Sequence, residues 1–157
     1  MHRISNDLSK AVRKATCEHL SILLADAIDL HYQVKQAHWN VKGPSFIALH
    51  ELFDKIAEDS DEYADLLAER IAQLGGQVHG TVRVAAAESR LKEYPLQASD
   101  QKDHIKALSA VLAAFGAAIR AGIEEFGKIG DADAADICTQ ISRGVDKYLW
   151  FVESHAL

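Results

Sequence analysis

Residues 36–54, QAHWNVKGPSFIALHELFD, decide the architecture expected for this chain. The Gly-Pro pair at 43–44 separates two long helical patterns, because glycine favours a helix end and proline cannot continue a helix. The chain therefore turns back here and pairs the two helices. His38 and His50 flank this break, and Asp54 follows four residues later. A simple helix–turn–helix needs none of these three side chains, so they are candidates for function.

Apolar residues at helical spacing predict four long helices and no strands. The expected bounds are about Asp7 to Ala37; after Pro44, with Ser45 as N-cap, to Gly75-Gly76; Ser99 or Asp100 to between Gly127 and Gly130; and the DADAAD stretch at 131–136 to the C-terminus. The link between the second and third helices is too long for a turn, and residues 81–88 can form a short helix within it. A helix of about 29 residues spans roughly 43 Å, a distance that this link can cross. The prediction is an all-α, ferritin-like four-helix bundle with a long crossover.

Composition describes an ordinary globular protein that forms one domain over residues 1–157. The chain is 48% hydrophobic and 25% charged, and its net charge of −6 argues against a surface-wide nucleic-acid footprint. Cys17 and Cys138 are isolated, which predicts reduced thiols. We see no signal peptide and no run of 18 consecutive apolar residues, so a cytoplasmic protein without membrane contact is expected.

The second helix has two faces. Its apolar side is opposed by a sector of about 100° that holds four residues of metal-ligating types: His50, Asp54, Asp65 and Glu69. Taken singly, each fits the solvated face of an amphipathic helix. Taken together they form two i, i+4 pairs, but Asp54 and Asp65 are separated by roughly 16 Å along the helix. Each pair is therefore half of a site.

The numbering suggests where the other half comes from. The midpoint of His50 and Glu69 lies between residues 59 and 60, and Asp54 and Asp65 have the same midpoint. Two copies of this helix that cross antiparallel there would place His50 opposite Glu69 and Asp54 opposite Asp65. A two-fold interface has this symmetry. Chance can also produce it in a helix rich in acids.

Imidazole and carboxylate ligands suit iron, and zinc or manganese are acceptable substitutes. His38, at the end of the first helix, would complete the cluster. No Glu-x-x-His motif occurs in the chain, which disfavours a di-iron site inside one bundle. Trp39 is expected to be a packing residue, with electron donation to the site as the alternative.

Three stretches together resemble the Dps mini-ferritins, the DNA-binding proteins from starved cells. They are KQAHWNVKGPSFIALHELFD at 35–54, DLLAERIAQLGG at 65–76 and ADICTQISRGVDKYLWFVE at 135–153. The resemblance covers essentially the whole chain. It implies a hollow homododecamer that oxidises Fe(II), preferentially with hydrogen peroxide, stores ferric mineral and thereby protects DNA.

The resemblance also implies roles for individual residues. His38, His50 and Asp54 would come from one subunit, and Asp65 and Glu69 from its two-fold mate. Asp136 matches the family's acidic residue in the three-fold pore that admits iron. Asp131 and Asp133 would add negative charge at the pore mouth or, equally, cap the fourth helix.

Two other functions stay open. The chain could be a nucleoid-associated DNA-binding protein with secondary iron chemistry, although its few N-terminal basic residues also fit a solvated helix face. It could instead be a helical assembly that holds zinc or no metal. The remaining histidines, including His31, show no comparable pattern and are assigned to the surface or to packing.

Overall fold

A computed structural model describes residues 1–156, which form five α-helices, a terminal 3₁₀ turn and no strand. The elements are α1 (Lys10–Asn40), α2 (Phe46–Gln73), α3 (Val82–Glu88), α4 (Gln101–Ile129), α5 (Ala132–Glu153) and η1 (Ser154–Ala156). The predicted all-α class is confirmed. The fourth helix was expected to continue to the C-terminus, but α5 ends at Glu153 and a 3₁₀ turn follows it; Leu157 lies outside the described residues.

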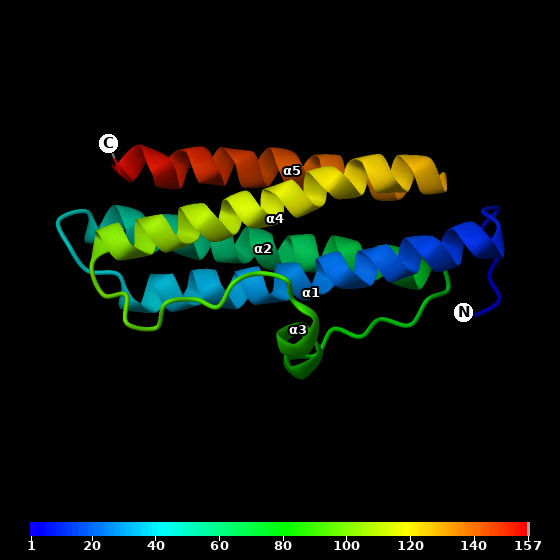
Figure 1. Cartoon of the computed structure of the whole chain (residues 1–157), viewed down its shortest axis with the longest axis horizontal. Coiled ribbons are helices and arrows are strands. Elements are labelled where there is room, and N and C mark those ends of the chain that lie inside the picture. The colour runs from blue at the N-terminus through cyan, green and yellow to red at the C-terminus, as the bar shows by residue number, and fades with distance from the viewer. Residues whose placement is uncertain (157) are drawn as a thin grey trace.

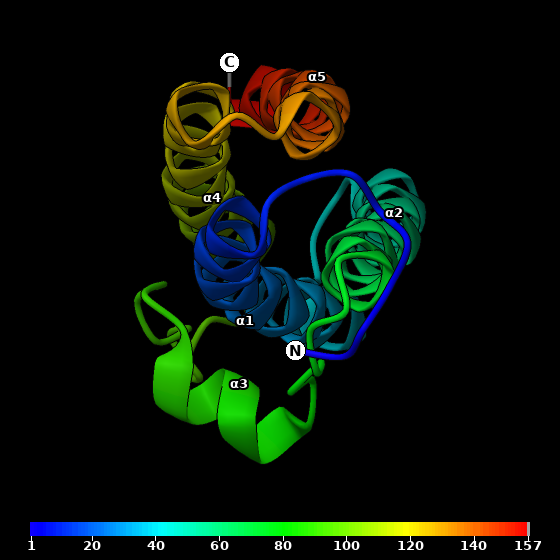
Figure 2. The same cartoon turned by 90° about the vertical axis from the view of Figure 1, so that its right-hand side faces the viewer.

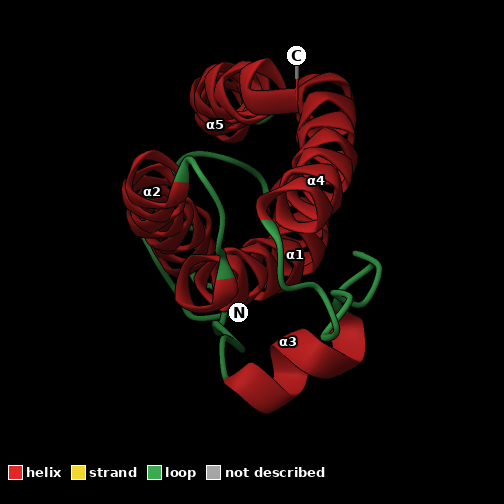
Figure 3. Cartoon of the chain, turned by 90° about the vertical axis from the view of Figure 1, so that its left-hand side faces the viewer, coloured by secondary structure: helices red, strands yellow, loops and turns green. Residues whose placement is uncertain are grey.

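Two antiparallel helix pairs, α1 with α2 and α4 with α5, pack side by side (Figure 1). The crossover from α2 to α4 carries α3, which lies outside the bundle against α1 and across the bundle's long direction (Figures 2 and 3). This is the predicted ferritin-like arrangement, including the short helix in the crossover.

Local capping explains where the helices begin and end. The first helix begins at Lys10 rather than Asp7, because the Ser9 hydroxyl accepts the backbone N–H of Val12. Ser45 precedes α2 as expected but makes no side-chain cap; instead its backbone N–H donates to Gln101 Oε1 at 3.0 Å. The helix α4 begins next to Asp100, within the predicted start, and Asp100 caps it by accepting two backbone N–H groups.

The core lies between the four long helices. On α2, Leu49, Phe53, Ile56 and Leu67 are at most 1% exposed, which confirms its predicted apolar face. The helix α4 contains no run of 18 consecutive apolar residues, but by length and mean composition it is apolar enough to span a membrane. A bundle's core helix passes the same test, and the fully buried Phe115 shows α4 in that position.

The crossover is tied to α1 by buried polar contacts. Asp26, which is fully buried, accepts the Arg90 backbone N–H at 2.7 Å and also pairs with the Arg90 guanidinium. Ser89 Oγ donates to Asp29 at 2.6 Å. These contacts hold the crossover against α1.

Candidate metal centre

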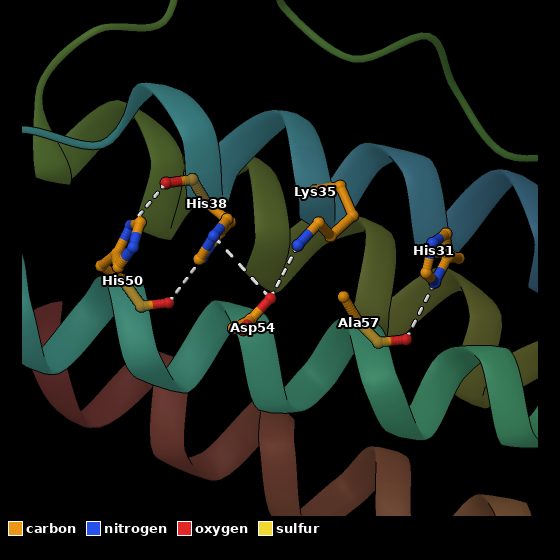
Figure 4. Close-up of polar contacts among 6 residues, drawn as sticks. All are labelled: His31, Lys35, His38, His50, Asp54 and Ala57. Carbon is orange, nitrogen blue, oxygen red and sulfur yellow. Dashed lines mark hydrogen bonds and ion pairs between the residues drawn. The ribbon is translucent and has the colours of Figure 1, made fainter.

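The two histidines beside the Gly-Pro break face each other across α1 and α2 (Figure 4). Their rings stack with centroids 3.8 Å apart and planes 20° apart. His38 Nδ1 lies 2.8 Å from the His50 carbonyl oxygen, and His50 Nδ1 lies 2.9 Å from that of His38. A carbonyl only accepts, so each Nδ1 carries the hydrogen and each Nε2 keeps a lone pair. Metal-ligating histidines are oriented by contacts of this kind.

The Gly-Pro break sets how α1 and α2 are aligned along each other. Gly43 has a φ of 142°, in the region that favours glycine. A Cβ at this position would lie 3.1 Å from Gln101 Cδ, so the side chain that binds the Ser45 N–H also fills the space. The turn between α1 and α2 is therefore fixed from α4, and it places His38 alongside His50.

Asp54 adds a carboxylate to the same groove. Its Oδ1 lies 3.7 Å from His38 Nε2 and accepts a hydrogen bond from Lys35 Nζ at 2.7 Å (Figure 4). The Lys35 hydrogen bond lowers the pKa of Asp54 and outweighs partial burial, which raises it. The carboxylate is thus ionised and ready to bind a cation, but a lysine already contacts it. Sequence reasoning missed Lys35, although it lies one turn before His38 on the same helix.

Asp65 and Glu69 do not join this cluster within one chain. Both are exposed on α2, further along the helix than Asp54. Across residues 1–156, no three His, Cys, Asp or Glu side chains come close enough together to hold a metal ion. A cavity of about 430 Å³ lies beside Asp65 and is also lined by Asp61, Leu24 and Val78. One chain therefore presents two separated groups of ligands.

Exposed apolar side chains surround the histidines. Trp39 is 62% exposed, so it does not pack into the core of its own chain as expected. Phe46 and Ile47 are 40% and 61% exposed. An apolar rim around a polar centre is characteristic of an interaction surface.

The three acids predicted for a pore differ from one another. Asp131 is 1% exposed, caps α5 through the Ala134 N–H at 3.0 Å, and pairs with Arg70 at 2.6 Å. It therefore has the capping role that the sequence left open and is no surface charge of this chain. Asp133 is exposed but lies 3.3 Å from the Arg70 guanidinium. Asp136 is exposed and forms no ion pair within the described residues.

Comparisons with known proteins agree with this architecture. The ferritin-like domain family model matches residues 17–156. A DNA protection during starvation protein from Agrobacterium fabrum is 40% identical over 98% of this chain and 95% of its own length. The solved Dps of Mycobacterium smegmatis, in a tetragonal crystal form, superposes with a TM-score of 0.93 at 30% identity, covering 98% of this chain and 94% of that one. The DpsA14 structure from Streptomyces coelicolor gives a TM-score of 0.91 at 34% identity, covering 96% and 89%.

Proposed function

The chain belongs to the Dps family of ferritin-like proteins, and on that premise we propose that it is a cytoplasmic ferroxidase and iron store. It oxidises Fe(II), preferentially with hydrogen peroxide, in a hollow homododecamer that keeps the ferric product as mineral. The observation that carries the proposal is the stacked histidine pair, whose two Nε2 atoms are free beside an ionised Asp54.

In this proposal, the site forms between subunits. His38, His50 and Asp54 come from one chain, and Asp65 and Glu69 come from a second copy across a two-fold axis. The shared midpoint of the ligand pairs supports this division, as does their separation within one chain. The exposed Trp39, Phe46 and Ile47 give the second copy an apolar surface to cover.

The donor set suits the substrate. Imidazole and carboxylate bind Fe(II) and Fe(III), whereas zinc or manganese could occupy the same ligands. Two Fe(II) ions each give one electron to one hydrogen peroxide, which takes up two protons and leaves as two waters. Pairwise oxidation therefore consumes both reagents of hydroxyl-radical formation, which would protect DNA from oxidative damage.

DNA binding is the alternative function, and part of the N-terminal positive charge is engaged within the chain. The N-terminal segment is held on the end of α2, where the His2 backbone N–H donates to the Gly75 carbonyl at 2.6 Å. Arg13 donates to the carbonyls of Leu8 and Leu74 at 3.2 and 3.0 Å. With a chain charge of −6, we place iron chemistry first.

Fe(II) oxidation with hydrogen peroxide, followed by ferric absorbance, tests the proposal. His50→Ala and Asp65→Ala should each lose the fast phase. In an equal mixture of the two variants, dissociated and reassociated, half of the dimers are hybrids that carry one intact site. About a quarter of the wild-type rate should therefore return. No recovery in properly reassembled hybrids would contradict a site shared between chains.

A further inference from the structure

A third histidine lies in the same groove as the proposed ferroxidase ligands. His31 Nδ1 is 2.9 Å from the Ala57 carbonyl oxygen, so it too contacts the backbone of α2 from α1 (Figure 4). Its Nε2 has no hydrogen-bond partner within residues 1–156. His31 therefore has the same protonated Nδ1 and free Nε2 as His38 and His50.

This contact differs from those of the other surface histidines. His19 and His155 also place Nδ1 near a carbonyl, but the carbonyl belongs to the residue four positions earlier in their own helix, and both rings are exposed. His31 is half-buried between two helices, where its orientation is fixed from both sides. It has the positioning of a ligand without an assigned metal.

The proposed two-fold axis brings an acid to His31. Asp61 lies seven residues after Asp54 and four before Asp65, so all three share one face of α2. Asp61 also lines the cavity beside Asp65. An axis between residues 59 and 60 places Asp61 of the second copy opposite residue 58, one position from the Ala57 carbonyl that holds His31. The symmetry that pairs the ferroxidase ligands thus pairs His31 with Asp61.

The two His31–Asp61 pairs of such a dimer both lie close to the two-fold axis. Ala57 and Asp61 are on opposite sides of it, each within about 4 Å along the helix. In a dimer, the two His31 rings and the two Asp61 carboxylates therefore gather around the same point. Two imidazoles and two carboxylates form a four-donor set that suits Zn(II), Fe(II) or Co(II).

We propose that the two-fold axis carries an additional divalent-metal site, formed by His31 and Asp61 from both chains, midway between the two ferroxidase centres. This inference rests on the two-fold packing of the proposed function. The site would give the dimer a position for a metal ion between the two ferroxidase centres.

Titration of the assembled protein with Co(II), followed by absorbance and with no oxidant present, tests this site. His31→Gln and Asp61→Asn should each remove about half an equivalent per chain, because one ion serves two chains. His155→Gln changes an exposed histidine outside the site, and this variant should bind as much Co(II) as the wild-type protein does. His50→Ala should lose the ferroxidase metal and keep the additional half equivalent. Anomalous diffraction from wild-type crystals soaked in Co(II) should show a metal on the axis, which does not depend on the variants.

Unchanged Co(II) binding in His31→Gln and Asp61→Asn, with metal loss in His50→Ala, would overturn the additional site and leave the ferroxidase proposal standing. Crystals that show a direct His31–Asp61 ion pair without metal would also overturn it. If His50→Ala also retains all its metal, the ferroxidase centre itself is absent and both proposals fail.

Discussion

Lys35 is the side chain that a metal ion would meet at Asp54 in the proposed centre. Its ammonium lies 2.7 Å from Oδ1, and the two side chains are 22% and 46% exposed. A metal ion at the same oxygen would be repelled by this ammonium or would have to displace it. We therefore predict that Lys35→Met tightens binding of Zn(II), used as a redox-inactive probe, by about two- to five-fold. Competition with a chromogenic chelator measures this affinity.

Lys55→Met is the matched control for that change. Lys55 also pairs with acids on α2, at 3.0 Å from Asp59 and 3.2 Å from Glu58, but none of these is a proposed ligand. The control should leave Zn(II) affinity unchanged. Equal tightening in both variants would mean that general surface charge, and not the Asp54 contact, sets the affinity.

His104 makes stability depend on pH. It is fully buried, its Nδ1 lies 2.6 Å from the Tyr94 hydroxyl, and its Nε2 has no partner within the described residues. Burial lowers its pKa below the ordinary 6.5, although nearby acids and the Asn40 backbone oppose the shift. The unfolded chain therefore takes up this proton at a higher pH than the folded chain does. The stabilisation is fully present above about pH 6.5 and decreases as pH falls below it.

We predict that His104→Gln reduces the loss of unfolding free energy between about pH 7.5 and about pH 5.5. Urea unfolding followed by circular dichroism at the two pH values measures this difference. Replacement of the exposed His155 with Gln should leave the pH dependence of the parent chain. If His104→Gln retains the full pH dependence, the destabilising proton binds elsewhere.

At the scale of the helices, Gly144 sets how closely α5 approaches α2. A Cβ at this position would lie 3.0 Å from Tyr63 Cζ and closer still to the hydroxyl oxygen. Alanine favours a helix, but here the overlap outweighs that preference. We predict that Gly144→Ala lowers the free energy of unfolding by about 1–3 kcal/mol, measured by urea denaturation.

Gly127→Ala is the control within the other helix of the same pair. A Cβ there would meet nothing within 4 Å, so only helix propensity changes. The free energy of unfolding of this variant should rise by up to about 1 kcal/mol. If Gly144→Ala also gained stability, Tyr63 would be free to move, and the contact would not set the spacing between helices.

Helix identity was predictable because each long helix carries its own apolar period, and α4 also has a capping residue, Asp100, before it. Contacts between residues far apart in the chain were not predictable from the sequence. The Arg70–Asp131 pair joins residues 61 positions apart, and nothing in the local pattern distinguishes Asp131 from its neighbour Asp133. Only tertiary packing shows that Asp131 is buried while Asp133 is exposed.

At the scale of the assembly, the proposed ligand set came from the sequence, because a two-fold axis would impose a relation between positions of one helix. His50, Asp54, Asp65 and Glu69 could therefore be proposed together. The histidine orientations and the Lys35 contact were not predictable, because they depend on how α1 and α2 pack. The structure of one chain adds these details, and among the described residues it brings no three possible metal ligands together.

In the proposed assembly, Asp136 would connect the charge of the shell to the supply of iron. It is exposed in the second turn of α5 and forms no ion pair within residues 1–156, so removal of its charge breaks no structural contact there. If three copies line a pore, they concentrate Fe(II) at its mouth, and this attraction weakens with salt. We predict that Asp136→Asn slows oxidation of limiting Fe(II) by roughly two- to ten-fold, with a smaller difference at high ionic strength.

Glu153→Gln, at the other end of α5, should show neither effect in the same stopped-flow measurement. A slowdown that does not depend on salt would indicate that Asp136 acts by some means other than electrostatic attraction of iron.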